Sequence, residues 1–306
     1  YQVRWSVLDG VDGEGLLVEP KEKTLARVVA IPDADQTPEQ LMGLAPGVPA
    51  GQQSARRLAE SGCQVVIPTL VNRKPFATDD PQLRRSQQTN REWLYRQAFH
   101  MGRHPIGYEV QKVQAAVDWF ANLPAENRPD PAIAVAGYAE GGQIALYTAA
   151  LSPQVKAVLV SGYFDSRDRL WAEPIYRNVW GFAKRFSDAE IVQMILPRRV
   201  VVEHAPVPRI EGQKGDWQTP DDKSVAAEFA RVARPTGNDG LDLVTAAGGK
   251  PSGPFSEQAL SGFAALLGFQ LAKSSQPSGN DLRTEFDPGG RQPRSVKQIE
   301  QHVQGL

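Results

Sequence analysis

The chain has 306 residues, 41% hydrophobic and 23% charged, which suits one large or two small domains of a soluble globular protein. No apolar run approaches the ~18 residues of a membrane span, which argues against an integral membrane protein. The 34 basic and 35 acidic residues are interspersed and give a net charge of −1, so no surface for nucleic acid or an anionic membrane is indicated. The single cysteine, Cys63, excludes an internal disulfide and a multi-cysteine zinc site. Because Cys63 opens the apolar run Cys63–Leu70, we expect a small buried side chain.

Apolar β-branched runs alternate with amphipathic stretches along the chain. An antiparallel pair of strands with a turn at Asp9–Glu14 opens it. A long surface loop is expected at Val71–Asn90 and an aromatic excursion at Gly162–Phe186. In chain order, the pattern predicts strands at Gln2–Leu8, Gly15–Val18, Leu25–Ile31, Cys63–Leu70, Ala132–Ala136, Lys156–Ser161, Arg199–His204 and Leu241–Thr245. It predicts helices at Ala50–Ser61, Arg91–His100, Ile106–Asn122, Gly142–Leu151, Asp188–Leu196, Lys223–Ala233 and Ser256–Leu271. This order favours an α/β fold with a mostly parallel sheet of about eight strands and helices on both faces.

The two ends of the chain differ from its middle. Residues 1–272 are predicted to form one domain, and Lys273–Pro293, rich in Ser, Pro, Gly and charge, has the composition of a linker. A helix then begins in Ser295–Leu306 with apolar residues at helical spacing and no capping signal. We expect this helix either to dock on the domain or to lead into a longer chain, with the longer chain favoured. Because the sequence starts at Tyr1 rather than Met and shows no charged-then-apolar leader, we also expect the native N-terminus to have been removed, by processing or by design.

The strongest motif lies at the end of a predicted buried strand. Gly137-Tyr138-Ala139-Glu140-Gly141 matches the G-x-S-x-G nucleophile elbow, with Ala139 in the serine position and a helix directly after it. The glycines flank a strained strand-to-helix turn where larger side chains would clash. Gly142 would let the helix approach the sheet. Ala139 has no oxygen and cannot form an acyl-enzyme.

On these residues the chain resembles the α/β-hydrolase superfamily, in its dienelactone hydrolase and acetyl xylan esterase-like branch, over about residues 15–272. The resemblance is closest in four segments: Gly137–Tyr147, Ser161–Phe164, Glu173–Trp180 and Pro197–Pro208. The last three are similar to large bacterial, planctomycete-type esterase proteins, in which a serine-less N-terminal hydrolase-like domain precedes a second domain with an intact elbow. The resemblance therefore implies an α/β-hydrolase fold with a small aromatic cap, and a second hydrolase domain or subunit as a partner.

The resemblance also implies where a catalytic triad would lie. Members attack esters with the elbow serine, a histidine deprotonates it, and an acid orients the histidine. Their oxyanion donors would correspond to the N–H of Glu140 and an N–H within Asp33–Asp35. The histidine should follow the last strand, but Ala246–Pro254 contains none. The four histidines of the chain are His100, His104, His204 and His302.

Three further groups of residues are weak candidates for chemistry. Glu203 and His204 end a strand where the acid would come, so His204 could be a displaced base or a hydrogen-bonded structural residue. Ser161, also at a strand end, could be another nucleophile, but no base is identified for it. The cap aromatics Trp171, Tyr176 and Trp180 could stack on a ligand or pack on the sheet. No recognised metal-ligand spacing or dinucleotide fingerprint occurs, so no metal or cofactor is expected.

The loss of both serine and histidine favours a catalytically degenerate domain, with no intact catalytic residue, that serves as scaffold or ligand-binding part of an esterase-like protein. One alternative is a serine carboxylester hydrolase whose nucleophile was replaced by Ala139. A second alternative is a carbohydrate-binding module under the aromatic cap. A small ester or a carbohydrate is the expected ligand class. The compartment, with export to the periplasm or beyond as one option, is left open.

Overall fold

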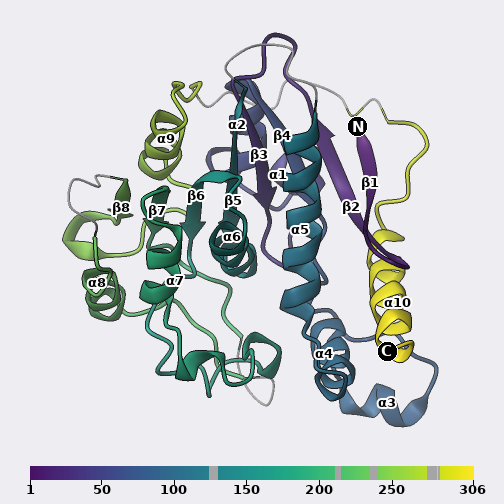
Figure 1. Ribbon diagram of the computed structural model, residues 1–306. Helices are drawn as coiled ribbons and strands as arrows, with labels where there is room; N and C mark the ends of the chain where they lie inside the picture. The colour runs from purple at the N-terminus through teal and green to yellow at the C-terminus, as the bar shows by residue number, and fades with distance from the viewer. Residues whose placement is uncertain (124–129, 211–214, 235–239, 274–280, 282) are drawn as a thin grey trace.

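The structure, a computed structural model, describes residues 1–123, 130–210, 215–234, 240–273, 281 and 283–306. Its centre is an eight-stranded sheet with the strand order β1-β2-β4-β3-β5-β6-β7-β8 (Figure 1). β1 and β2 pair antiparallel, β2 also pairs antiparallel with β4, and the remaining pairs are parallel. The strands are β1 (Gln2–Leu8), β2 (Val11–Val18), β3 (Ala26–Ile31), β4 (Cys63–Pro68), β5 (Ala132–Tyr138), β6 (Val155–Ser161), β7 (Arg199–Glu203) and β8 (Leu241–Val244). The mostly parallel sheet predicted from the sequence is confirmed.

Helices cover both faces of this sheet. The core on one face includes side chains of α5, α6 and α7, and the core on the other includes those of α1, α2 and α9. The helices are α1 (Pro38–Leu41), α2 (Ser54–Glu60), α3 (Pro81–Ser86), α4 (Asn90–His100), α5 (Pro105–Asn122), α6 (Glu140–Leu151), α7 (Asp188–Ile195), α8 (Asp222–Ala230), α9 (Glu257–Leu266) and α10 (Arg291–Gln304). Short 3-10 turns lie at Ala50–Gln52, Ile175–Arg177, Phe182–Lys184 and Ala247–Gly249.

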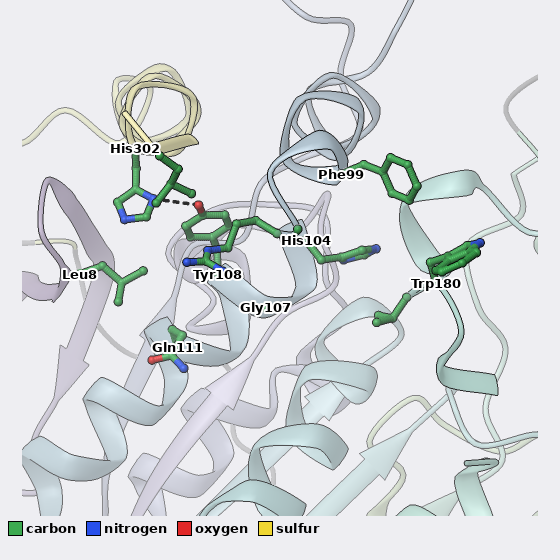
Figure 2. A pocket seen from close by; sticks show the side chains of 12 residues that line it. Leu8, Phe99, His104, Gly107, Tyr108, Gln111, Trp180 and His302 are labelled. Carbon is green, nitrogen blue, oxygen red and sulfur yellow. Dashed lines mark hydrogen bonds between the residues drawn. The ribbon is translucent and has the colours of Figure 1, made fainter. Parts of the chain in front are cut away.

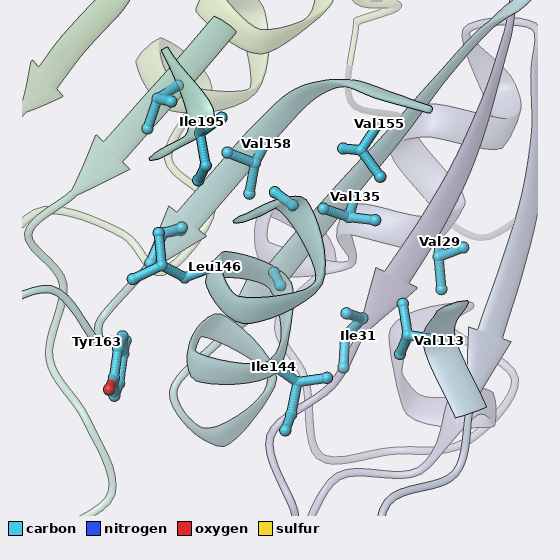
Figure 3. Close-up of a cluster of buried hydrophobic side chains, with 14 of the residues drawn as sticks. Val29, Ile31, Val113, Val135, Ile144, Leu146, Val155, Val158, Tyr163 and Ile195 are labelled. Carbon is cyan, nitrogen blue, oxygen red and sulfur yellow. The ribbon is translucent and has the colours of Figure 1, made fainter. Parts of the chain in front are cut away.

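The central strands are buried because helices cover them on both sides. Every residue of β3 and β4 is buried, which accounts for their nearly continuous Val, Ile and Ala content. Figure 3 shows side chains of β3 and β5 beside α6, with Val29 and Val135 on the sheet and Ile144 on the helix. Cys63 in β4 is fully buried, and this burial raises the pKa of its thiol to about 12. The thiol is therefore an inert core side chain, as the apolar run predicted.

Helix α10 packs on this same domain, beside β2 and α4. Its apolar residues Val296, Ile299 and Val303 are buried in a cluster with residues of β2, α4 and α5. Arg294 adds an ion pair to Glu14 of β2, with an Nη2–Oε2 distance of 2.9 Å. Helix α10 therefore docks on the domain, and this packing does not test the expected longer chain. The division of the chain at residue 272 stays a prediction.

Two stretches differ from their predicted form. The first turn is shorter than expected, because β2 already begins at Val11. Val71–Asn90 contains α3, and its first two residues are buried rather than exposed. Buried backbone here is paired: the N–H of Val71 donates to Glu109 Oε1 at 3.0 Å. Among the described helices, none is long and apolar enough to cross a membrane.

Candidate functional site

Strand β5 leads into α6 through one residue with unusual backbone geometry. Ala139 has φ 54° and ψ −111°, in the region of positive φ that residues other than glycine rarely adopt. Its N–H donates to the carbonyl oxygen of Ser161 at the end of β6, at 2.9 Å. The side chain of Ala139 is 0% exposed. The turn has the backbone form of a nucleophile elbow, but its central side chain is a buried methyl group.

The glycines beside this turn allow backbones to touch. A Cβ on Gly137 would overlap the carbonyl oxygen of Gly141, and a Cβ on Gly141 would overlap that of Pro32. A Cβ on Gly142 would lie 2.9 Å from the carbonyl oxygen of Ser161. The sequence pattern therefore has a steric basis, because the start of α6 lies directly against β3 and β6.

The backbone donors expected to form an oxyanion hole already bind an anion of the chain itself. The N–H of Glu140 donates to Asp33 Oδ1 at 3.3 Å, and the N–H of Asp35 donates to Asp33 Oδ2 at 3.2 Å. The N–H of Asp33 donates to Gln36 Oε1 at 3.2 Å. Arg73 holds the Asp33 carboxylate in a bidentate pair, with both N–O distances 2.7 Å. The carboxylate of Asp33 thus binds backbone donors that the resemblance assigns to a substrate oxyanion.

Glu203 ends β7, where the resemblance places the triad acid, and is 1% exposed. It accepts hydrogen bonds from Ser161 Oγ at 2.6 Å and from the N–H groups of Phe255 and Ser256 at 2.7 and 2.8 Å. A Cβ on Gly253 would lie 2.5 Å from Glu203 Oε1, so the segment before α9 closes tightly over the carboxylate. Glu203 and Ser161 therefore bind each other and the backbone, with no imidazole between them.

A family model describes the part of the chain that contains the elbow. The dienelactone hydrolase family model matches residues 14–168. The chain belongs to the dienelactone hydrolase family. A comparison with curated protein sequences finds no match.

Solved structures of low identity share the fold of this dienelactone hydrolase family member. A Bacteroides fragilis protein that carries the provisional name acetyl xylan esterase has a TM-score of 0.56 and 17% identity, over 80% of this chain and 66% of that one. A methylesterase has a TM-score of 0.54 and 17% identity, over 88% of this chain and 55% of that one. A 2,6-dihydroxy-pseudo-oxynicotine hydrolase has a TM-score of 0.51 and 16% identity, over 93% and 72%. The chain spans less than two thirds of the first two proteins. These likenesses establish the α/β-hydrolase fold, not a reaction.

Glu140, directly after the elbow, is the centre of a buried ion network. Its carboxylate is 2.8 Å from Arg177 Nη1, 3.3 Å from Arg73 Nη2 and 3.8 Å from Arg91 Nη2. Arg91 pairs in turn with Glu109, at 2.8 Å. Burial alone would raise the pKa of Glu140, but Arg177, Arg91 and Arg73 lower it to about 2. Glu140 is thus ionised at neutral pH and is surrounded by three arginines with buried side chains next to the turn.

The cap aromatics do not share one surface. Tyr176 is 3% exposed, and its hydroxyl accepts a hydrogen bond from Arg73 Nε at 3.2 Å, so it belongs to the ion network. Trp171 and Trp180 are 81% and 75% exposed. Of the three, only Trp180 lines a described groove, and that groove does not include the elbow.

His204 is held between two loops. Its Nδ1 lies 3.2 Å from the carbonyl oxygen of Gly249 and its Nε2 lies 3.0 Å from that of Pro220. Both ring nitrogens therefore face acceptors other than residue 139, as expected for a structural histidine. Within the described part of the chain, no three His, Cys, Asp or Glu side chains are grouped to hold a metal ion.

The remaining histidines also have local roles. His104 caps α5: its Nδ1 accepts from the N–H of Ile106 at 3.1 Å, and its Nε2 lies 3.2 Å from the carbonyl oxygen of Asn178. His302 Nδ1 on α10 is 2.8 Å from the hydroxyl of Tyr108. His100 is exposed at the end of α4.

Sequence reasoning missed the charged side chains that define this site. The pattern indicates the backbone of Asp33 but not its side chain, and it predicts a surface loop for Arg73. Nothing in the pattern distinguishes Arg91 or Arg177 from other arginines. The one available signal was the position of Asp33 and Glu140 just after buried strands, where parallel strands bring loops together.

Proposed function

We propose that this domain is a catalytically silent member of the dienelactone hydrolase family, with a scaffolding or ligand-binding role in an esterase-like protein. Its partner would be a second hydrolase domain or subunit, which the resemblance to serine-less N-terminal domains suggests. The observation that carries the proposal is the Asp33 carboxylate on the N–H of Glu140.

An occupied oxyanion site opposes ester hydrolysis in a direct way. The tetrahedral intermediate places negative charge on an oxygen that needs backbone donors within about 3 Å. Here those donors already bind Asp33, and a second anion beside it would be repelled. Displacing Asp33 would break its buried bidentate pair with Arg73, and removing one partner from such a pair typically costs ~3–5 kcal/mol.

The acid and base positions support the same conclusion. Both carboxylate oxygens of Glu203 accept hydrogen bonds, from Ser161 and from the backbone before α9. Both ring nitrogens of His204 face backbone carbonyl oxygens. A serine at position 139 would therefore lack a base, an orienting acid and open oxyanion donors.

The test is hydrolysis of 4-nitrophenyl acetate by three proteins: the unsubstituted chain, Ala139→Ser, and the double variant Ala139→Ser with Ser252→His. Ser252 is suitable because its hydroxyl lies 3.4 Å from Glu203 Oε1, so an imidazole there could reach the acid. We expect all three to stay at the same background rate, because Asp33 still occupies the donor of Glu140.

Either gain of turnover would overturn the proposal, and the two gains mean different things. Saturable hydrolysis by Ala139→Ser alone, two orders of magnitude above the parent, would identify a serine ester hydrolase whose nucleophile had been replaced. Turnover only in the double variant would show that Ser and His are the sole missing parts. Thermal melting of each variant checks that the fold is retained.

A further inference from the structure

A groove separate from the elbow lies between the start of α5, the end of α10 and the cap. Its volume is about 790 Å³, within the range of ligand-binding sites. Figure 2 shows two sides to it: Phe99, His104 and Trp180 on one, and Leu8, Tyr108 and His302 on the other. The two sides differ in chemistry, and that difference indicates what the groove can bind.

One side offers flat apolar surface. Trp180 is 75% exposed and Phe99 is 46% exposed, although side chains of this size are normally covered. His104 lies beside them, and both of its ring nitrogens are engaged by the backbone. This side can therefore contribute ring faces but few hydrogen bonds, which suits a planar or ring-shaped ligand.

The other side offers hydrogen-bond donors and positive charge. Arg103, Gln111 and His302 line the groove, and its described lining residues include no aspartate or glutamate side chain. Arg103 has no carboxylate partner among the described ion pairs. Its charge acts on the Tyr108 hydroxyl: burial raises the pKa of Tyr108, and Arg103 opposes that rise. The guanidinium thus lies within electrostatic reach of the groove floor, where it could pair with an anion.

We propose that this groove binds small carboxylates that have a ring with an apolar face. The ring would stack on Trp180, and the carboxylate would pair with Arg103. Aromatic acids and sugar acids share this chemistry. The proposal does not depend on whether the elbow is silent, because none of the groove residues belongs to the elbow network.

The groove offers an unusually clean blocking variant. Gly107 lies on its floor between the two sides (Figure 2), and a Cβ built on it meets nothing within 4 Å. Gly107→Phe should therefore fill the groove without a clash inside the fold. Gly107→Ala is the matched control, and because alanine favours a helix more than glycine does, it should not lower the melting temperature.

The experiment is calorimetric titration of the chain with two matched pairs of ligands. 2-Naphthoate is compared with 2-naphthamide, and methyl β-D-glucuronide with methyl β-D-glucoside. We expect at least one carboxylate to bind with a dissociation constant on the order of 0.1–1 mM, as is usual for ligands this small. Its neutral analogue should bind about tenfold more weakly.

The variants then assign the binding to the groove. Arg103→Gln should weaken binding of the carboxylate ligand about tenfold, and Gly107→Phe should abolish it. Gly107→Ala should leave the dissociation constant within about twofold of the parent value. Binding of only one pair identifies the source as aromatic or as sugar acid. No binding of either carboxylate, equal binding of acid and neutral analogue, or binding unchanged by Gly107→Phe would overturn the proposal. None of these results bears on the ester hydrolysis that tests the silent elbow.

Discussion

Replacing Glu140 with glutamine removes one charge from the centre of the buried network and keeps the shape of the side chain. Arg177 Nη1, 2.8 Å from the carboxylate, would be left without this partner, and both side chains are 1% exposed. The neighbouring arginines keep the carboxyl ionised in the folded protein, and its pKa falls from 4.5 to about 2. The free-energy cost of Glu140→Gln can therefore be calculated from these two pKa values.

A folded-state pKa below the unfolded value stabilises the fold above the unfolded pKa, and the stabilisation is lost as the pH falls toward the folded value. At ~1.36 kcal/mol per pKa unit, the lowered pKa of Glu140 corresponds to about 3 kcal/mol at pH 7. Removing one partner of a buried ion pair costs ~3–5 kcal/mol, in agreement. At pH 3, the same two pKa values leave about 1.4 kcal/mol of this stabilisation. Glu140→Gln should thus destabilise the protein at pH 7 and less than half as much at pH 3.

The assay is urea unfolding followed by tryptophan fluorescence at both pH values. Glu92→Gln is the control, because Glu92 pairs on the surface with Arg96, which is 52% exposed. Such surface pairs contribute less than about 1 kcal/mol. If Glu140→Gln costs no more than Glu92→Gln, or if its cost is the same at pH 3 as at pH 7, the network does not hold Glu140 as described.

Two further predictions concern other parts of the molecule. Burial lowers the pKa of His104 from 6.5 to about 4, so the stability that its neutral form allows is lost as the pH falls from 6.5 toward 4. Between pH 7 and pH 5 the parent should lose about 2 kcal/mol of its free energy of unfolding because of this group. His104→Asn keeps a capping oxygen and should not show this loss. Equal pH dependence of the two proteins in thermal melts would contradict the prediction. Gly253 and Gly248 both have positive φ, but only at Gly253 would a Cβ meet Glu203. Gly253→Ala should therefore lower stability by ~1–3 kcal/mol more than Gly248→Ala, and equal melting temperatures would show that the segment does not close on Glu203.

The fold followed from local sequence patterns because burial on a sheet has a local signature. The apolar run from Cys63 gave β4, and the apolar stripe of α5 gave a helix with Val113 and Val117 fully buried. The elbow followed because its glycines are required by close backbone contacts whatever residue lies between them. Helix ends were less well placed: α9 ends at Leu266, short of the predicted Leu271.

The contents of the site did not follow, because ion pairs have no periodic pattern. Asp33 and Glu140 are 107 residues apart in the chain, and Arg73 is 40 residues from Asp33. Their partnership depends on strand order, which brings the ends of β3, β4 and β5 together. A charged residue after a buried strand could equally have faced solvent, and only the packed structure distinguishes the two outcomes.

The way this site is filled bears on the proposal that the domain is catalytically silent. An active oxyanion hole keeps backbone donors free for the transition state, and unpaired buried donors cost stability. In this chain Asp33 satisfies the N–H of Glu140, Arg73 neutralises Asp33, and Glu203 is enclosed by the segment where a histidine would lie. These arrangements involve residues far from position 139 in the sequence. A single replacement of serine by Ala139 would not produce them, so they support the proposed silent domain over an ester hydrolase that lacks only its nucleophile.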